Sequence, residues 1–513
     1  MAGAPEGVLS VGMEQKNRFS TLLEQLVATA EVKHATLAKA LQYDVSYISK
    51  WIGGRVLPTE KSASDILQKI SHSLVENASE AGLAQLERAY EVKLSDELWQ
   101  AIYDNLIAEY YYVLDLQQGS GSVVAPNVSF FPELSMKKFM TKMSHPVLRR
   151  VNSLNIMAAI DLFSIANEFR LQVVNLGNNN PMDNHIYPDV RFSLLINLDK
   201  ANQEPIHNAL FISNMLANSS RVDFQLHCSD FAHGKVMFVV KHDFAITGML
   251  IRPNTCAAVT VCEGKENSTP LYYDIQSLCT RETLLFSKLS MRDMLYQSME
   301  YVHSLLAPDR QWFLGHMTEH VLPRDLFEEM AVRVLGPGKA DYLAEVLSVH
   351  NLTQRILDCG NVQLMICESA ISRFVVSGEL DFFNHKLVLN FEQRKRVIEN
   401  FCAILKKSAS LQIRLVHEPL ISDSQYSSSP SVFLSSTISY LRLCTNWADE
   451  NLLLRFNRAE MKELYDGFFR EIWNSESHVV SNLEEIDRFV NHLLQSLDLL
   501  ATVKDGNPAG AGA

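Results

Sequence analysis

Several motifs that would reveal an enzyme are missing from this sequence of 513 residues. It contains no GxxxxGK[ST] phosphate loop, no GxGxxG after a predicted strand and no HExxH zinc motif. The eight cysteines form no CxxC pair, which favours reduced, mostly buried thiols over disulfides or zinc ligands. His227, Cys228, His233 and Cys256 are close in sequence, but their spacing matches no zinc module. We therefore expect neither a metal nor a cofactor.

Signals for export or membrane insertion are also missing. No apolar run approaches the ~20 residues that a membrane-spanning helix needs. Residues 1–13 have neither a basic start nor a long apolar core, so they do not resemble a secretory signal. We expect a cytoplasmic protein with a disordered stretch at 1–13 and no interaction with a membrane.

Basic residues are in the minority, since the formal net charge is −13 at pH 7. Hydrophobic residues make up 47% and charged residues 20% of the chain, which is ordinary for a soluble protein of several domains. Residues 14–71 differ, because they hold eight Lys and Arg against six Asp and Glu. A nucleic-acid surface would be confined to this part, since phosphate repels the acidic remainder.

Residues 37–58, LAKALQYDVSYISKWIGGRVLP, predict two short helices joined by a turn. The inward-facing residues recur at helical spacing: Leu37, Ala38 and Leu41, then Ile48 and Trp51. Asp44 is a good N-cap for the second helix. Gly53-Gly54 ends that helix, and Pro58 prevents its continuation.

The outer face of the second helix carries small, hydrogen-bonding or basic side chains, namely Val45, Ser46, Tyr47, Ser49 and Lys50. A major groove about 12 Å wide admits one helix with such a set of side chains. The alternative is a generic helical hairpin, because any amphipathic pair of helices has this periodicity.

The pattern resembles the helix-turn-helix of the lambda-repressor/Cro-like (XRE) family of transcription regulators. The residues that match the family pattern without a gap are Leu37, Ala38, Leu41, Ile48, Ser49, Trp51, Gly54 and Pro58. Two positions depart from it. Gln42 replaces the turn glycine, and Tyr43 replaces a small aliphatic residue. If the turn keeps a positive φ, the glutamine costs about 1 kcal/mol.

The resemblance implies a homodimer on a palindromic operator in double-stranded DNA, with half-sites about one helical turn apart. The outer-face residues would meet base edges or nearby phosphates. Outside that face, the expected DNA-binding residues are His34, Thr36, Arg55 and Lys61. His34, Arg55 and Lys61 would contact the phosphate backbone. Ordinary solvated side chains are the alternative for these three.

The rest of the chain is expected to contain helices followed by a large α/β region. A helix-turn-helix domain at 14–76 should precede a helical connector or dimerisation pair at 80–118 and a Gly/Ser-rich linker at 119–128. The predicted parts beyond the linker are an α/β half with a hairpin at 129–285, a helical segment at 286–385, a second α/β half at 386–503 and a disordered tail at 504–513. The predicted fold class is therefore multidomain, an all-α N-terminal domain plus a mixed sheet with many helices.

Two segments, 192–227 and 386–417, both predict a strand, an Asn-containing turn, a helix and a strand, which suggests a duplicated βαβ unit. Nearby, His233-Gly234-Lys235 opens a predicted hairpin and weakly resembles the HxK signature of phospholipase-D-like enzymes. The resemblance is degenerate, because Val240 occupies the slot of the expected Asp and the second segment has no HxK. That chemistry needs a nucleophile and a general acid, so we expect no enzymatic activity. The simpler interpretation is that His233 and Lys235 are ordinary surface residues at the edge of a hairpin.

These patterns predict a sequence-specific transcription regulator of bacterial or phage type. Its C-terminal region would form the oligomer and sense a small-molecule or peptide effector. Two alternatives stay open: a phosphodiesterase or nuclease targeted by the N-terminal domain, and a structural interaction protein whose helix-turn-helix is vestigial.

Overall fold

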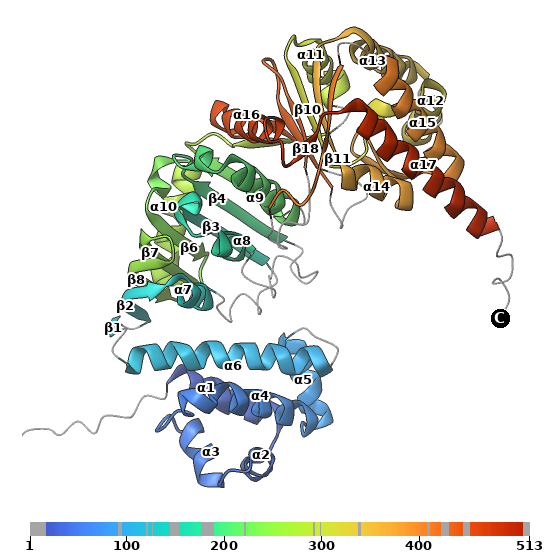
Figure 1. Cartoon of the computed structure of the whole chain (residues 1–513). Helices are drawn as coiled ribbons and strands as arrows, with labels where there is room; N and C mark the ends of the chain where they lie inside the picture. The colour runs from blue at the N-terminus through green and yellow to red at the C-terminus, as the bar shows by residue number, and fades with distance from the viewer. Residues whose placement is uncertain are drawn as a thin grey trace, which may run out of the picture. The chain divides into compact units, whose positions relative to one another are not determined.

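The computed structural model describes residues 17–90, 95–118, 122–125, 127–143, 153–175, 189–219, 222–290, 293–297, 299–336, 340–407, 411–421, 430–444 and 452–505. Within these ranges, an N-terminal helical region is followed by a large α/β region with two mixed eight-stranded sheets, as predicted (Figure 1). None of the described helices is long and apolar enough to cross a membrane. The stretch at 1–13 and residues 506–513 of the tail, both expected to be disordered, lie outside the described residues. The first two residues of the expected tail, 504 and 505, instead end the last helix, Leu483–Asp505.

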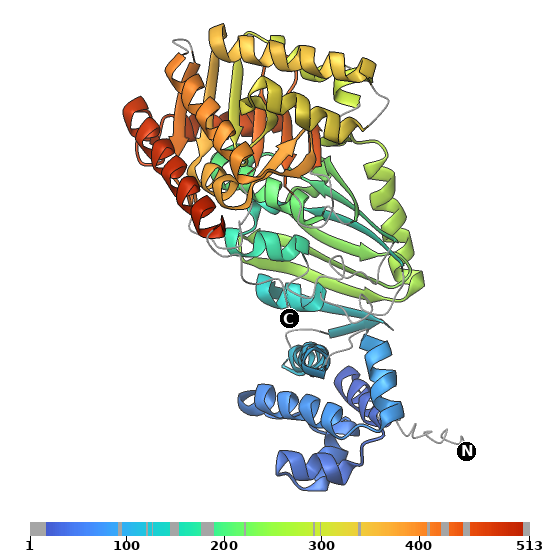
Figure 2. The same ribbon diagram turned by 90° about the vertical axis from the view of Figure 1, so that its right-hand side faces the viewer.

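The helices described in the N-terminal region are α1 (Arg18–Ala30), α2 (His34–Leu41), α3 (Val45–Ile52), α4 (Glu60–Glu76), α5 (Glu80–Tyr90) and α6 (Ser95–Gln117). A single apolar core joins them, in which Leu86, Ile102 and Leu106 of α5 and α6 are buried with residues of α1 to α4. The helices at 80–118 therefore complete the core of the helix-turn-helix domain. Figures 1 and 2 show α6 across α1 and α4, with α2 and α3 on the other side of this bundle.

Helix α6 also holds the segment that leaves α3. The Tyr110 hydroxyl donates a hydrogen bond of 2.8 Å to the carbonyl oxygen of Pro58, and both residues are buried. The Tyr110 ring meets Phe19 of α1 edge-on, with 5.9 Å between ring centroids. This contact fixes the end of the helix-turn-helix on the longest helix of its domain.

The first sheet has the strand order β1-β2-β8-β7-β6-β3-β4-β5. Its strands are β1 (Ser122–Ala125), β2 (Val128–Ser135), β3 (Ser153–Ile160), β4 (Asp189–Ile196), β5 (Asp223–Cys228), β6 (Lys235–Val240), β7 (Phe244–Arg252) and β8 (Thr255–Glu263). The helices along this part are α7 (Met136–Met143), α8 (Asn167–Asn175), α9 (Pro205–Asn218) and α10 (Lys265–Cys279). Strand β1 lies inside the expected linker 119–128, because Val123 and Val124 are β-branched and favour an extended chain.

The second sheet has the strand order β18-β14-β11-β10-β15-β16-β17-β9. Its strands are β9 (Phe286–Leu289), β10 (Arg310–Leu314), β11 (Val362–Cys367), β14 (Leu411–Val416), β15 (Ser431–Leu434), β16 (Tyr440–Leu443), β17 (Leu452–Phe456) and β18 (Val479–Val480). The helices are α11 (Glu300–Leu306), α12 (Arg324–Leu335), α13 (Ala340–Cys359), α14 (Glu368–Ser377), α15 (Phe391–Lys407), α16 (Ala459–Trp473) and α17 (Leu483–Asp505). Figure 1 shows α16 on one side of this sheet and α12 to α15 with α17 on the other.

The segment 286–385 was expected to be helical, but β9, β10 and β11 lie within it. Strands β10 and β11 pair in parallel and are mostly buried, so their short apolar runs show no alternation of polar and apolar residues. Periodicity alone does not distinguish such a run from part of a buried helix. The structure therefore corrects this part of the prediction.

The two large sheets share one topology. Apart from the edge strands β1 and β18, each has the order first, seventh, sixth, fifth, second, third and fourth, counted along the chain. The prediction of a second βαβ unit at 386–417 is wrong in its first strand. This strand, β13 (His385–Val388), pairs with β12 (Glu379–Phe382) in a separate two-stranded sheet. Phe383 and Asn384 make the tight turn of that hairpin with positive φ. The duplication thus covers whole sheets rather than one βαβ unit.

Candidate nucleic-acid interface

The turn between α2 and α3 has a left-handed residue. Gln42 adopts φ 58° and ψ 38°, and its N–H donates to the carbonyl oxygen of Lys39. The N–H of Tyr43 donates to the carbonyl oxygen of Ala38 at 3.0 Å. These bonds satisfy carbonyl groups that the end of α2 leaves open. The turn therefore needs the backbone conformation that glycine adopts most easily, although the chain has glutamine there.

Both ends of α3 are fixed by side chains. At the start, an Asp44 carboxylate oxygen accepts a hydrogen bond of 2.8 Å from the Ser46 N–H. Hydrogen bonds from the Ser46 hydroxyl and N–H lower the pKa of Asp44, so the cap remains negatively charged. At the other end, the Ser20 hydroxyl of α1 donates to the carbonyl oxygen of Trp51 at 2.6 Å. Gly54 follows with φ 76°, and its carbonyl oxygen accepts from the Asn17 amide at 3.4 Å.

The two faces of α3 have opposite environments. Ile48, Trp51 and Ile52 are buried in the core of the helical domain. The residues predicted to meet DNA are all exposed: Val45, Ser46, Tyr47, Ser49 and Lys50. The structure therefore brings this predicted set together on one open face of one helix.

Aromatic contacts order this face. The Tyr47 ring lies 5.7 Å from the Tyr43 ring and 6.3 Å from the Trp51 ring, between centroids. Tyr43 also packs edge-on against Trp51 at 5.4 Å. The Lys50 ammonium lies 5.4 Å from the centroid of Tyr47. Tyr43 was not among the predicted DNA contacts. The signal that could have identified it is its departure from the small aliphatic residue of the family pattern.

The predicted backbone-contact residues lie on three segments of the same domain. His34 is the first residue of α2, Lys61 is in the first turn of α4, and Arg55 follows α3. All three side chains are exposed. Thr36, the remaining predicted contact, is half-buried. Their exposure leaves each able to approach a phosphate.

The His233-Gly234-Lys235 turn lies at the start of β6, beside the end of β3. The Gly234 N–H donates to the Asp161 carboxylate at 2.8 Å. His233 Nδ1 lies 3.3 Å from the Asp199 carboxylate, and both side chains are 63% exposed. The Lys235 ammonium instead donates to the carbonyl oxygen of Phe231 at 2.6 Å. The Lys235 ammonium is thus held by a backbone carbonyl group four residues before it in the chain.

The second sheet has different chemistry at the corresponding place. Strand β15 runs antiparallel to β10 and begins beside its end, where the Gly315 N–H donates to the Ser431 hydroxyl at 3.1 Å. Ser431 in turn contacts His316 Nδ1 at 3.1 Å. Ser431 is the first residue of β15, where β6 begins with Lys235, so this start has no counterpart of that lysine.

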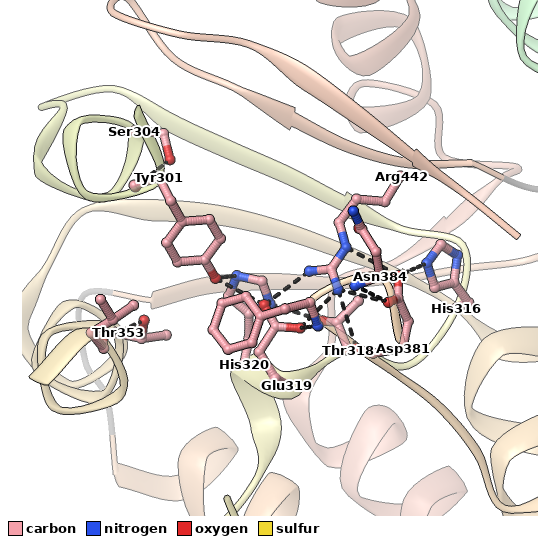
Figure 3. A network of polar contacts seen from close by, with 12 residues as sticks. Tyr301, Ser304, His316, Thr318, Glu319, His320, Thr353, Asp381, Asn384 and Arg442 are labelled. Atoms are coloured by element: carbon pink, nitrogen blue, oxygen red, sulfur yellow. Dashed lines mark hydrogen bonds and ion pairs between the residues drawn. The ribbon is translucent and has the colours of Figure 1, made fainter. Parts of the chain in front are cut away.

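A buried network of polar side chains extends from His316 (Figure 3). His316 Nε2 lies 3.0 Å from the Asp381 carboxylate, which also accepts from Arg442 Nε at 3.0 Å. The other two guanidinium nitrogens of Arg442 donate to both oxygens of Glu319 at 2.9 Å. The Tyr301 hydroxyl donates to Glu319 at 2.9 Å. These side chains satisfy one another in the core of the second sheet.

Charge pairing explains how this network is stable. Burial raises the pKa of the Glu319 and Asp381 carboxyls, but Arg442 outweighs it and keeps both pKa values below the ordinary range. Burial also acts to lower the pKa of His316, but Cys444 and Asp381 outweigh it and raise that pKa to about 9. At His320 burial outweighs the opposing effect of Glu319 and lowers the pKa to about 4. The network therefore balances two cations against two carboxylates at neutral pH.

No protein-family model matches the chain, and no curated protein sequence is significantly similar to it. Among the described residues, no group of three or more His, Cys, Asp or Glu side chains could hold a metal ion.

Replacing Gln42 by glycine should raise the free energy of unfolding by about 1 kcal/mol, because glycine adopts a positive φ without steric cost. Urea unfolding of the full chain measures the change, and hydrogen exchange of α2 and α3 localises it. Gln42→Ala is the matched control and should gain nothing, since alanine keeps the Cβ. A loss of stability in the glycine variant would contradict this account of the turn.

His316 should make the fold sensitive to alkaline pH. Its folded-state pKa lies above its ordinary value of 6.5, so protonation stabilises fully below that pH. The contribution is lost as the pH rises through about 9. By linkage this is on the order of 3 kcal/mol.

Urea unfolding between pH 6 and about pH 10 checks this linkage. His316→Gln should remove this part of the pH dependence, whereas His492→Gln, at an exposed position on α17, should keep it. Equal pH profiles for wild type and His316→Gln would refute the assignment.

Proposed function

We propose that this chain is a sequence-specific DNA-binding transcription regulator that reads duplex DNA with α3. One observation carries the proposal: one face of α3 is anchored in the core while its other face leaves the predicted contact residues exposed. An α-helix with one exposed polar face fits the major groove, where each base pair presents a distinct pattern of donors and acceptors. The turn geometry at Gln42 and the cap at Asp44 present this face.

The protein acts as a homodimer on a palindromic operator. One helical domain has few basic residues, so a single domain neutralises few phosphates and binds weakly. Two domains on one duplex add their binding free energies and specify two half-sites. The acidic α/β region supplies the oligomer contacts.

The same region holds the effector that regulates binding. A cavity of about 670 Å³ at the second sheet is a candidate place for it. Arg455, Arg458 and Lys462 line this cavity together with serine and threonine residues. Such a lining suits a polar small molecule or a peptide end.

The proposal is tested by selecting bound sequences from random duplexes with the purified full chain. Ser46→Ala combined with Lys50→Ala should reduce affinity for the selected operator by ~100-fold, since each good base contact is worth about 1–3 kcal/mol. Binding is measured by gel shift, and circular dichroism checks that the variant is folded. Lys69→Ala removes an equivalent charge from α4 and should bind like wild type. Unchanged affinity in the double variant would remove α3 from the interface.

A second candidate function is a phosphodiesterase targeted by the helical domain. It is favoured by the position of His233, which lies between β5 and β6 and beside the Asp199 carboxylate. It is opposed by the Lys235 contact to Phe231 and by the absence of a histidine–lysine pair at the described start of β15.

We expect wild type and His233→Ala alike to leave a chromogenic phosphodiester and labelled DNA intact, while both bind the operator. Release of product by wild type but not by His233→Ala would instead support the enzyme. Asp199→Asn serves as a second variant at this site, because it keeps the shape and removes the charge.

A further inference from the structure

The exposed face of α3 has apolar side chains at its edges, beside the polar groups at its centre. Val45 is 42% exposed, Tyr47 is 46% exposed, and Tyr43 in the preceding turn is 38% exposed. Scattered exposed apolar residues are normal on a protein surface, but these three flank the polar centre of one helix face. Val45 lies at one edge, and Tyr47 with Tyr43 lies at the other, since residues two apart do not share a side of a helix. A partner that covers this face therefore needs apolar atoms at both edges.

The rings in this group are held in position. Tyr43 and Tyr47 meet edge-to-face, and both also pack against the buried Trp51. Edge-to-face pairs add about 0.5–1.5 kcal/mol beyond the area they bury. The Tyr47 ring is therefore a fixed surface, and little side-chain entropy is lost when it is covered.

The charges around the group indicate what it faces. The Asp44 carboxylate caps the start of α3 and covers N–H groups that would otherwise attract a phosphate. A phosphate is therefore disfavoured at this end of the helix. Lys50, one turn further along, is the cation of the same face. This end of α3 is suited to base edges instead.

Thymine is the base that offers an apolar group in the major groove, its 5-methyl. We propose that Val45 and Tyr47 contact thymine methyl groups in each operator half-site, beside a guanine whose O6 and N7 accept from Lys50. This inference rests on the proposed function and deepens it, because it names the bases that α3 recognises. Ser46 and Ser49 hydrogen-bond to neighbouring base edges or phosphates.

Replacement of thymine by uracil tests the proposal, since it removes the 5-methyl and leaves the Watson–Crick pairing unchanged. The probe is the duplex selected with the full chain, with uracil placed at one thymine at a time. At one or two positions per half-site, wild type should bind about fourfold more weakly. This factor corresponds to about 0.8 kcal/mol for one buried methyl group.

Matched variants assign the effect to side chains. Val45→Ala and Tyr47→Ala should each bind the thymine operator more weakly and lose the preference for thymine over uracil at their own position. Tyr47→Phe keeps the ring and should keep the preference. Replacing the adjacent guanine by 7-deazaguanine should weaken wild type but leave Lys50→Ala unchanged.

The possible failures are distinguishable. If no operator is selected from random duplexes, the proposed function itself is wrong. If an operator is selected but uracil is tolerated at every thymine, only the thymine contact is overturned. If Val45→Ala and Tyr47→Ala bind the operator like wild type, the apolar group serves another partner, such as a protein, and the proposal is again overturned.

Discussion

The attachment of α3 to the helical core is the contact on which the DNA-binding proposal depends. The helix is only eight residues long, and a helix of that length is not stable alone in water. Its stability comes from burying Ile48 and Trp51 and from the Ser20 hydroxyl, which donates a hydrogen bond to the carbonyl oxygen of Trp51. Because this side is fixed, the opposite side must face outward. The same packing that stabilises the helix therefore presents its contact residues.

The two large sheets show how one topology can hold different chemistry. The first leaves His233 exposed at the start of β6, paired with Asp199. The second fills the corresponding region with Arg442 and its two carboxylates, which are buried. Removing one partner from a buried charge network is strongly destabilising, because the remaining charges lose their compensation. The stability of the second sheet therefore depends on all the members of this network together.

Local signals were sufficient to predict the helices of the N-terminal region, but not that α5 and α6 complete its core. The spacing of Leu37, Leu41, Ile48 and Trp51 specified its helices, and Asp44 and Gly54 specified their ends. The α/β class also followed from alternating apolar runs. The sequence did not reveal the strands between 286 and 385, because strands buried on both faces lack the alternation that identifies them. The β12–β13 hairpin was missed because its turn, Phe383-Asn384, has little of the usual glycine signal.

The buried network could not have been predicted from spacing, since its members come from segments far apart in the chain. Glu319, Asp381 and Arg442 meet only because the fold brings β16 beside the segment that follows β10 and beside strand β12. The open face of α3 differs in this respect, because every residue on it lies within two turns of one helix. Contacts between residues far apart in the chain can be identified only once the fold is known, whereas the faces of a single helix can be predicted from its sequence.

The charge distribution of the helical region and the apolar residues at the edges of the exposed α3 face support the same proposal about recognition. Few cations on the helical domain mean little nonspecific attraction to phosphate, and the acidic remainder opposes it further. Contacts to base edges must then supply a larger share of the binding free energy than in a strongly basic domain. In the proposed complex, Val45 and Tyr47 supply such contacts through shape and apolar area, which do not weaken as salt rises. The proposal therefore implies that affinity for arbitrary DNA falls sooner than affinity for the operator as salt rises, because few positive charges contribute to binding.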